Sequence, residues 1–535
     1  MRSNPHPALV FVVIFVVIFL LHTPLLSLPY FWDEAGYYVP ATRDLLLSGS
    51  LIPHTTVSNA HPPLVLAWIA LWWKVAGYSP LVARSSMVVL AAFSLLGVFR
   101  LAERVANTNV AIGATVCTAL YPVFFAQSSL IQVDLPAAGL IFWGLLAYVE
   151  RRWKASAVWF SLAALAKETA IIAPLALAVW EFLRRVGPVK KKLGRWDPDA
   201  GLSSSAVPVF CGLLIPVVPL VLWYGYHYAK TGYVFGNPEF FRYNVAATLN
   251  PLRFILALLL RLWQSFGYLH LWLLTGAMLL VMMEPPLEDE GISRSRIAVA
   301  VQIAFYVLTG AYVVAMALIG GAVLARYLLP VVPLVIIVAI STLRRRLRAW
   351  AWLTGAVAAA FVLGWFWNPP YGFSPEDNLA YRDYVLLHEN AERFLEARHP
   401  MATVLTAWPA SDELTRPWLG YTTRPMQVVR IEDFSLEQML SAVEFRDNFD
   451  VALVFSTKYE PPHALFDRFE KWRELKHRFF GYERDLPPDI SAQMLGGNVV
   501  YSERRKGQWI AVIELKREQI MNAENSSPQL NRRLR

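Results

Sequence analysis

Two adjacent carboxylates, Asp33 and Glu34, are the first residues of this chain whose types could perform a reaction. They belong to the segment Trp-Asp-Glu-Ala-Gly-Tyr-Tyr at residues 32–38, directly after the first long apolar run. An acidic group at the end of a membrane-crossing run is costly unless it is paired or used, so it indicates a functional site. The alternative is that both residues only cap a helix at the membrane surface. We interpret the pair as part of a reaction centre.

Four further candidates lie near the ends of later apolar runs: His61, Asp134, Lys167 and Arg326. Lysine and arginine at such points can bind a phosphate through charge-assisted hydrogen bonds, although they can equally be anchors whose charged heads reach the interface. Asp134 is followed by Leu-Pro, which also fits a plain helix N-terminus. His61 precedes Pro-Pro and would carry full charge only near or below its reference pKa of about 6.5. Its simplest interpretation is the entry to a helix at the interface.

The composition requires many apolar helices to position these residues. Of the 535 residues, 56% are hydrophobic and 17% are charged, and the mean hydropathy is +0.40. These values are typical of an integral membrane protein. The net charge of +9 comes from short Lys and Arg clusters between apolar runs, which report topology and do not indicate a nucleic-acid partner. Cys117 and Cys211 both fall inside apolar runs, so we expect no disulfide framework.

Runs long enough to cross a bilayer predict about eleven spanning helices. They cover residues 8–28, 80–100, 109–127, 134–149, 155–167, 168–183, 205–226, 267–283, 297–317, 322–342 and 349–367. Basic clusters follow in every second loop, which by the positive-inside rule places the N-terminus in the cytoplasm and the candidate site residues outside. The aromatic-rich segment 61–77 is short, and it preserves this alternation only as an interfacial helix on the outer face. Compact loops favour a bacterial inner membrane.

The composition changes at about residue 368, where spanning runs end and acidic residues become frequent. We divide the chain into a membrane domain at 1–367, a small extracytoplasmic α/β domain at 368–517 and a disordered tail at 518–535. Helical periodicity covers 376–398, 435–445 and 463–480, with a capping box from Ser435 to Gln438. Strand-like runs cover 402–407, 428–431, 451–456, 498–502 and 509–515. Gly496-Gly497 is interpreted as a turn before a hairpin.

Several motifs occur in one order along the first 370 or so residues. They are residues 32–38 with Leu-Ser-Gly at 47–49, His-Pro-Pro-Leu at 61–64 with its Trp-rich helix, Asp-Leu-Pro at 134–136 and Arg-Tyr-Leu-Leu-Pro at 326–330. This set resembles the integral-membrane C-type glycosyltransferases, specifically the bacterial relatives of protein O-mannosyltransferase and of lipid A aminoarabinose transferase. The resemblance implies transfer of a sugar from a polyprenyl phosphate donor to a lipid, glycan or protein acceptor on the non-cytoplasmic face.

The resemblance also implies roles for individual residues. Asp33 would be the base that takes the acceptor proton, with inversion at the anomeric carbon, and Glu34 would orient or tune it. Asp134 would lie near the reaction centre, and His61, Lys167 and Arg326 would contact the donor phosphate. The loop 227–250, with Tyr233, Glu239 and Arg242, is aromatic and polar in a way that fits sugar recognition or a lid.

The chemistry is consistent with a single base. A polyprenyl phosphate leaves as an already stabilised anion, so no second carboxylic acid is needed to protonate it, in contrast to glycoside hydrolysis. We expect no cofactor; a divalent metal held by Asp33, Asp134 and His61 remains an alternative, although their spacing is not that of a metal motif. A transporter for lipid-linked sugars and a non-catalytic membrane scaffold are the rival functions. Paired broken helices of related halves, common in transporters, are not evident in the sequence.

Overall fold

The computed structural model describes residues 6–185, 206–236, 238, 248–319, 321–461 and 468–516. Two compact units divide it: residues 1–385 with 458–482, and residues 386–457 with 483–535. Glu239, Arg242 and the predicted tail lie outside the described residues.

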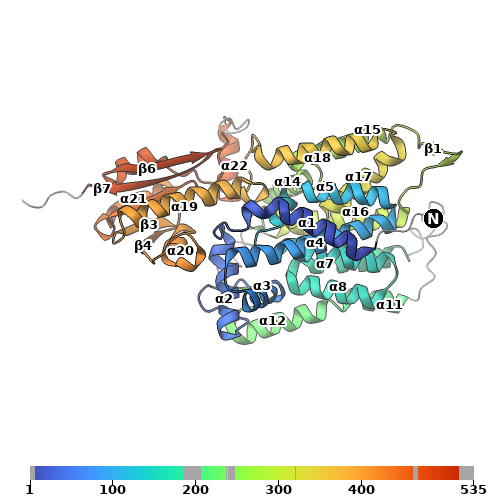
Figure 1. Ribbon diagram of the computed structural model, residues 1–535, viewed down its shortest axis with the longest axis horizontal. Coiled ribbons are helices and arrows are strands. Elements are labelled where there is room, and N and C mark those ends of the chain that lie inside the picture. Colours follow the sequence, from blue (N-terminus) through green and yellow to red (C-terminus); the bar gives the residue numbers. More distant parts are fainter. Residues whose placement is uncertain are drawn as a thin grey trace, which may run out of the picture. The chain divides into compact units, whose positions relative to one another are not determined.

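The first unit consists of apolar helices, drawn mainly blue to yellow in Figure 1. Its longer helices are α1 (Pro7–His22), α4 (Pro80–Val105), α5 (Thr108–Leu120), α7 (Asp134–Val149), α8 (Trp153–Ala166), α9 (Ile172–Leu183), α11 (Ala206–Leu214), α12 (Val217–Thr231), α14 (Pro251–Phe266), α15 (Leu271–Val281), α16 (Val299–Leu318), α17 (Val332–Arg346) and α18 (Trp350–Phe366). Each of the eleven predicted runs overlaps at least one of these helices. Five stretches in the described chain are long and apolar enough to cross a bilayer, and four more apolar helices are shorter. The protein is therefore a multi-pass membrane protein.

Helices α14 and α15 correct the predicted span at 267–283. The apolar stretch Pro251–Val281 is broken at Tyr268–His270, where Leu269 and His270 have positive φ, so α15 begins only at Leu271. Helix α14 was not predicted. It carries Arg253 and Arg261 within an apolar sequence, and both arginines are buried. The predicted loop 227–250 also starts later than expected, because α12 continues to Thr231.

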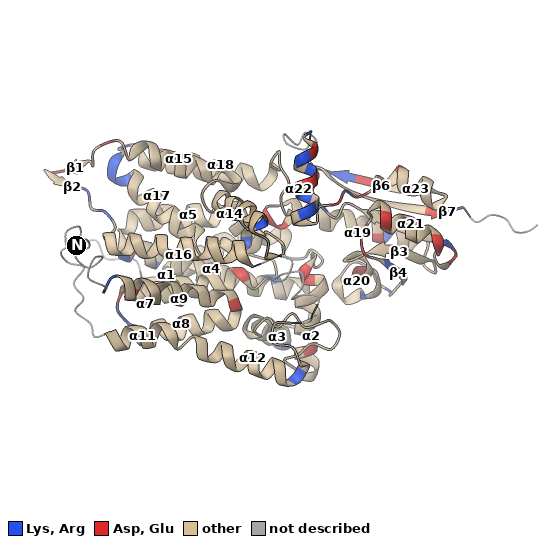
Figure 2. Ribbon diagram, turned by 180° about the vertical axis from the view of Figure 1, so that it is seen from behind, with Lys and Arg blue, Asp and Glu red and all other residues tan. Residues whose placement is uncertain are grey.

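Shorter elements connect the ends of the apolar helices. They are α2 (Val39–Ser48), the predicted interfacial helix α3 (Leu64–Ala76), α6 (Pro122–Gln127), α22 (Glu470–Phe480), the π-helix η2 (Glu34–Tyr38), the 3-10 turns η1 (Thr23–Leu25), η3 (Glu168–Ile171), η5 (Tyr268–His270), η6 (Ala325–Leu328) and η7 (Pro375–Asp377), and the small hairpin of β1 (Glu288–Asp289) and β2 (Ile292–Ser293). In Figure 2 the apolar helices are mostly tan along their lengths, and the charged colours gather at helix ends and in connections.

The second unit is built on a mixed five-stranded sheet in the order β4-β3-β5-β7-β6. Its strands are β3 (Thr403–Ala407), β4 (Gln427–Ile431), β5 (Val451–Phe455), β6 (Gly497–Arg505) and β7 (Gln508–Leu515), at the five predicted positions. β3 pairs in parallel with β4 and β5, whereas β7 pairs antiparallel with β5 and β6. All five residues of β5 are buried, as a central strand requires. The predicted α/β architecture is confirmed.

Helices complete this second unit: α20 (Ala410–Thr415), α21 (Leu436–Glu444), α23 (Pro488–Leu495), the turns η8 (Pro417–Leu419) and η9 (Arg446–Asn448), and most of α19 (Ala380–Arg398), which begins in the first unit. Ser435 caps α21 as predicted, because its side chain accepts a hydrogen bond from the Gln438 amide. The turn predicted at Gly496-Gly497 is confirmed at Gly496, and the predicted hairpin follows as β6 and β7. Gly496 ends α23 with φ +67°, and Gly497 is already the first residue of β6.

Candidate active site

The segment that carries Asp33 and Glu34 is held in place by Glu34. The Glu34 carboxylate is fully buried and pairs with both terminal nitrogens of Arg84, at 3.1 Å and 2.7 Å. The same carboxylate accepts the backbone N–H of Phe31, at 2.6 Å, and of Ile131, at 2.5 Å. Glu34 thereby ties the start of η2 to α4 and to the segment before α7. These contacts fix the backbone beside Asp33.

Trp32 adopts φ +41°, which is an uncommon conformation for a bulky residue. It immediately precedes Asp33, and the following π-helix gives residues 34–38 a wider backbone spiral. π-helical turns and strained residues concentrate at functional sites because surrounding contacts must hold them in place. Here the Glu34 contacts supply that hold. The local geometry therefore presents Asp33 on the side opposite to its neighbour.

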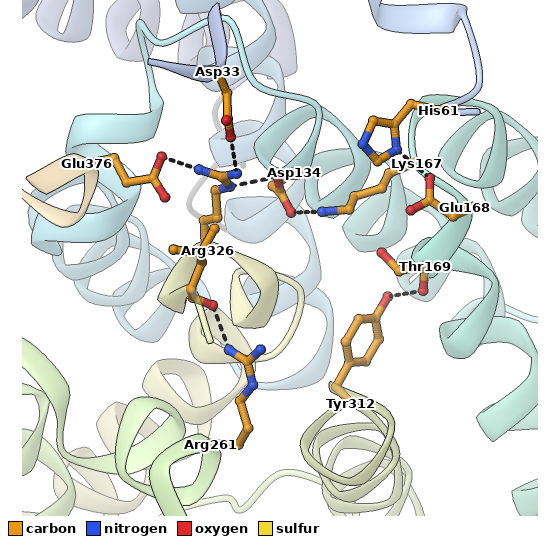
Figure 3. Close-up of polar contacts among 11 residues, drawn as sticks. Asp33, His61, Asp134, Lys167, Glu168, Thr169, Arg261, Tyr312, Arg326 and Glu376 are labelled. Carbon is orange, nitrogen blue, oxygen red and sulfur yellow. Dashed lines mark hydrogen bonds and ion pairs between the residues drawn. The ribbon is translucent and has the colours of Figure 1, made fainter. Parts of the chain in front are cut away.

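Arg326 is the centre of the candidate site (Figure 3). It lies in η6, between α16 and α17, and its guanidinium contacts three carboxylates. Nη2 is 2.7 Å from Asp33 Oδ2, Nε is 3.2 Å from Asp134 Oδ2, and Nη1 donates to Glu376 Oε2. Asp33 and Glu376 are 343 positions apart in the sequence, and the Arg326 guanidinium contacts both.

A second cation, Lys167, extends the cluster on the other side of Asp134. Its Nζ donates to Asp134 Oδ1 and lies 4.1 Å from the centre of the Tyr327 ring. Such a position over an aromatic face stabilises an ammonium group. Asp134 starts α7 and Lys167 ends α8, so the pair joins the ends of two neighbouring helices. A small cavity opens beside this pair. It is lined by Asp134, Lys167, Thr169, Tyr312 and Tyr327 and by the apolar residues Ala137, Ile141, Ala170 and Pro330.

His61 lies next to this cluster but has its own partner. His61 Nδ1 is 2.9 Å from Glu168 Oε2, and Glu168 directly follows Lys167 (Figure 3). The charges of His61 and Lys167 hold the pKa of Glu168 down at about 2 although burial works in the opposite direction. Glu168 is thus an anion at working pH. The alternative metal site from Asp33, Asp134 and His61 is not assembled, because the two aspartates bind Arg326 while His61 faces Glu168.

The three carboxylates around Arg326 differ in access to solvent. The side chain of Asp33 is 34% exposed, whereas those of Asp134 and Glu376 are 3% and 4% exposed. Burial raises the pKa of Glu376 to about 8, against the attraction of Arg326. Glu376 therefore takes up a proton more readily than an ordinary glutamate. Asp33 is the carboxylate of this group that an incoming molecule can reach.

The structure brings together four predicted residues, Asp33, Asp134, Lys167 and Arg326, and places His61 beside them. Tyr233 is about half exposed, and its carbonyl oxygen lies 2.7 Å from His227 Nδ1. It is not among the cluster's contacts. The other two candidates of that loop, Glu239 and Arg242, lie outside the described residues.

Two important residues were missed by sequence reasoning. Arg84 sits in the first turns of an apolar run, where a buried arginine is itself a functional or structural signal. Glu376 follows a proline at the change of composition, and it was assigned to the soluble domain. Nothing in its local sequence reveals that it contacts Arg326.

Comparison with known proteins gives one family match and a common fold. Residues 60–195 match the model of the dolichyl-phosphate-mannose-protein mannosyltransferase family. No curated protein sequence matches the chain. The crystal structure of ArnT from Cupriavidus metallidurans bound to undecaprenyl phosphate superposes with a TM-score of 0.52 at 14% identity, over 94% of this chain and 97% of ArnT. For ArnT in the apo state the TM-score is 0.50 at 14% identity, and the superposition covers 95% of this chain and 98% of ArnT.

The chain has the C-type glycosyltransferase fold. The similarity to ArnT covers nearly the whole length of both chains, so it includes the helical unit and the sheet unit. The matched residues 60–195 include α3 to α9 together with His61, Asp134 and Lys167. The predicted C-type glycosyltransferase fold is confirmed, and the family match over residues 60–195 agrees with the predicted class of membrane glycosyltransferase.

Proposed function

We propose that this glycosyltransferase moves a sugar from a polyprenyl-phosphate-linked donor to a lipid, glycan or protein acceptor, with Asp33 as the base. The single observation that carries the proposal is the accessibility of Asp33 within a cluster of otherwise buried carboxylates on Arg326. A base must reach the proton that it removes. In the reaction, Asp33 takes the proton of the acceptor hydroxyl or amine as the acceptor atom bonds to the anomeric carbon. The bond from that carbon to the phosphate oxygen breaks, and the configuration inverts.

The cations of the cluster suit the leaving phosphate. Arg326 and Lys167 are both buried, so their charges act through little water and count for more than at an exposed surface. The similarity to a protein crystallised with undecaprenyl phosphate supports a polyprenyl phosphate as the carrier. When the phosphate binds, Arg326 can exchange its contact with Asp33 for one with the anion. The base would then be released only in the presence of the donor.

The remaining carboxylates keep the cations in position without cancelling them. Burial raises the pKa of Glu376, so this carboxyl group takes up a proton more readily than an ordinary glutamate. With Glu376 protonated, Asp33 and Asp134 balance Arg326 and Lys167, and an arriving phosphate does not meet a third carboxylate charge. This division of charge favours an anionic donor.

The same contacts support a mechanism without a metal cofactor. In sites that use a divalent ion, carboxylates converge on the metal. Here Asp33, Asp134 and Glu376 converge on a guanidinium, which has a fixed set of five N–H donors and a permanent charge. Arg326 therefore supplies the positive charge at the reaction centre.

The positions of basic residues support an outward-facing site. Helix α7 starts at Asp134 and is followed by Arg151 and Arg152, whereas α17 follows Arg326 and ends with Arg344–Arg346. The site residues and the basic clusters thus lie at opposite ends of the same helices. By the positive-inside rule, the basic ends are cytoplasmic. The N-terminus is then cytoplasmic in a bacterial inner membrane, and the α/β unit, on the outer side, guides acceptors.

A transfer assay tests the proposal. Purified full-length protein in lipid nanodiscs is mixed with a panel of polyprenyl phosphate sugars and membrane extract as acceptor. The comparison is native protein, Asp33→Asn, and the control Asp289→Asn, which makes the same change in the exposed β1–β2 hairpin. We expect transfer from one donor, lost in Asp33→Asn and retained in Asp289→Asn. Full activity of Asp33→Asn would refute the base, and donor translocation without turnover would favour a transporter.

A further inference from the structure

A buried group of ionisable side chains in the second unit lies outside the chemistry considered so far. His388 and Glu392 are one helical turn apart on α19, and Glu413 comes from α20. One ligand atom from each of the three lies within 4.8 Å of the other two. His388 Nδ1 is 2.7 Å from Glu413 Oε2 and 3.8 Å from Glu392 Oε1. All three side chains are at most 1% exposed.

The two glutamates have few partners for buried carboxylates. Among the described residues, no N–H or hydroxyl group donates a hydrogen bond to either oxygen of Glu392 or to Oε1 of Glu413. No described Lys or Arg pairs with either of them. A buried carboxylate without a partner destabilises the fold by its full desolvation penalty. Glu392 is thus a fully buried polar group that points into the cluster and lacks a donor there.

We propose that His388, Glu392 and Glu413 bind a divalent transition-metal ion, with Zn²⁺ as the preferred ion. One imidazole and two carboxylates are a ligand set that suits zinc, since histidine nitrogen and carboxylate oxygen are both usual zinc ligands. A divalent cation would neutralise the two carboxylates and occupy the lone pairs that have no donor. The i, i+4 spacing of His388 and Glu392 is the spacing by which one helix face supplies two metal ligands.

The geometry needs only small adjustments to accept the ion. With metal–ligand bonds of about 2.0–2.2 Å, tetrahedral ligands are separated by about 3.4 Å. The observed separations of 2.7 Å and 3.8 Å bracket this value. A carboxylate rotation that moves the oxygens by less than about 1 Å would make the two separations equal. A water molecule would complete the four ligands.

The surroundings favour a structural role for the ion. The His388 ring meets the Phe455 ring at 4.6 Å, edge to face, and Phe455 is a buried residue of the central strand β5. Three protein ligands with a water are the ligand pattern of catalytic zinc, but all three side chains here are at most 1% exposed, so we expect the ion to stabilise the fold. The ion would fasten α19 to α20 across the core of the sheet unit. This role is independent of the sugar-transfer reaction.

The competing arrangement uses a proton in place of the metal. Glu392 would be protonated and donate to Glu413, which also accepts from His388. That arrangement binds no metal and would survive Glu392→Gln, because an amide can donate the same hydrogen bond. The two arrangements therefore differ in metal content and in their response to a neutral isostere.

The test measures metal bound to full-length, tag-free protein in nanodiscs. The protein is equilibrated with ZnCl₂, separated from free metal by gel filtration and analysed for zinc by mass spectrometry. We expect about one zinc per chain in native protein, and zinc-edge absorption spectra with one nitrogen and two carboxylate ligands at about 2.0–2.2 Å. Zinc should also raise the Tm of native protein by several degrees, because it binds only the folded state.

The matched variants are Glu392→Gln and Glu389→Gln, which make the same change on the same helix three residues apart. Glu389 lies outside the cluster and pairs with Arg393. We expect Glu392→Gln to lose at least nine-tenths of the bound zinc and the rise in Tm, and Glu389→Gln to keep both. Native protein without stoichiometric zinc, or equal zinc in native and Glu392→Gln, would overturn the proposal. If Glu392→Gln does not fold, the ligand set from the absorption spectrum of native protein decides.

Discussion

Asp33 and Glu34 are neighbours in the chain, yet they belong to two different ionic regions of the molecule. The Glu34 carboxylate is fully buried and accepts hydrogen bonds from Arg84 and from two backbone amides. The Asp33 carboxylate is one-third exposed and has one arginine contact, to Arg326. The cation on Glu34 serves a single carboxylate, whereas the cation on Asp33 is shared by three.

The difference separates a structural carboxylate from a reactive one. A carboxylate with all its lone pairs satisfied in a buried site is locked in place and cannot take a proton from a substrate without breaking those contacts. An accessible carboxylate with one exchangeable contact can. We infer that Glu34 fixes the backbone and that Asp33 performs the chemistry. Substitutions in both regions test this difference between the two carboxylates.

The largest stability effect is expected for Arg84→Ala. The substitution leaves Glu34 as an uncompensated buried charge, so it should cost about 3–5 kcal/mol of folding free energy. Thermal unfolding of the purified protein measures it. The control Arg100→Ala breaks a partly exposed pair with Glu103 and should cost less than about 1 kcal/mol. Equal losses in the two variants would contradict a structural role for the Glu34–Arg84 pair.

Lys167→Gln should weaken donor binding with a smaller effect on folding. The ammonium group donates to Asp134. The charge-assisted hydrogen bond that it would give to the donor phosphate is worth about 1.5–3 kcal/mol. We expect the KM for the polyprenyl phosphate sugar to rise about 10- to 100-fold. Lys154→Gln, at the other end of α8, is the control and should keep the native KM. An unchanged KM in Lys167→Gln would exclude the lysine from the donor site.

The pH dependence should reveal Glu376. Its pKa is raised to about 8, so its carboxyl group is neutral below that pH and becomes an anion above it. The added negative charge beside Arg326 should oppose the donor phosphate, and kcat/KM should fall about three- to tenfold between pH 7 and pH 9. Glu376→Gln keeps the side chain neutral and should flatten this part of the profile. A fall of the same size in Glu376→Gln would assign it to another group.

His61→Gln should have the smallest effect, a change in kcat/KM of about two- to fivefold. The histidine pairs with Glu168, the neighbour of Lys167 in the chain, so we expect it to support the lysine and not to replace it. Steady-state kinetics with the same donor measure the change. A loss as large as that in Lys167→Gln would mean that His61 contacts the donor directly.

Much of the helical unit could be predicted because a bilayer imposes long apolar runs that are visible in the sequence. Helix α14 was missed because Arg253 and Arg261 interrupt its apolar pattern, and only the structure reveals that both arginines are buried. In the sheet unit, the five strands followed from β-branched and aromatic residues. The short helices α20 and α23 were missed, since one or two turns leave little periodicity.

The candidate site was predictable where charge interrupts an apolar environment. Asp33, Asp134, Lys167 and Arg326 stand out at the ends of apolar runs, and the structure brings them together. The ion-pair partners of these residues could not be predicted from the sequence. Glu34 and Asp33 are equivalent by residue type, and only the family resemblance assigned them different roles. The positions of Arg84 and Glu376, which depend on tertiary packing, distinguish the anchored carboxylate from the accessible one.

The most direct test compares Asp33→Asn with Glu34→Gln in two measurements, single-turnover sugar transfer and thermal unfolding. For Asp33→Asn we expect the transfer rate to fall about 10²- to 10⁴-fold, as for loss of a general base, while the Tm stays close to that of native protein. For Glu34→Gln we expect the Tm to fall and the rate to decrease only in step with the loss of folded protein. The reverse pattern, with a stable but inactive Glu34→Gln and an active Asp33→Asn, would contradict the account.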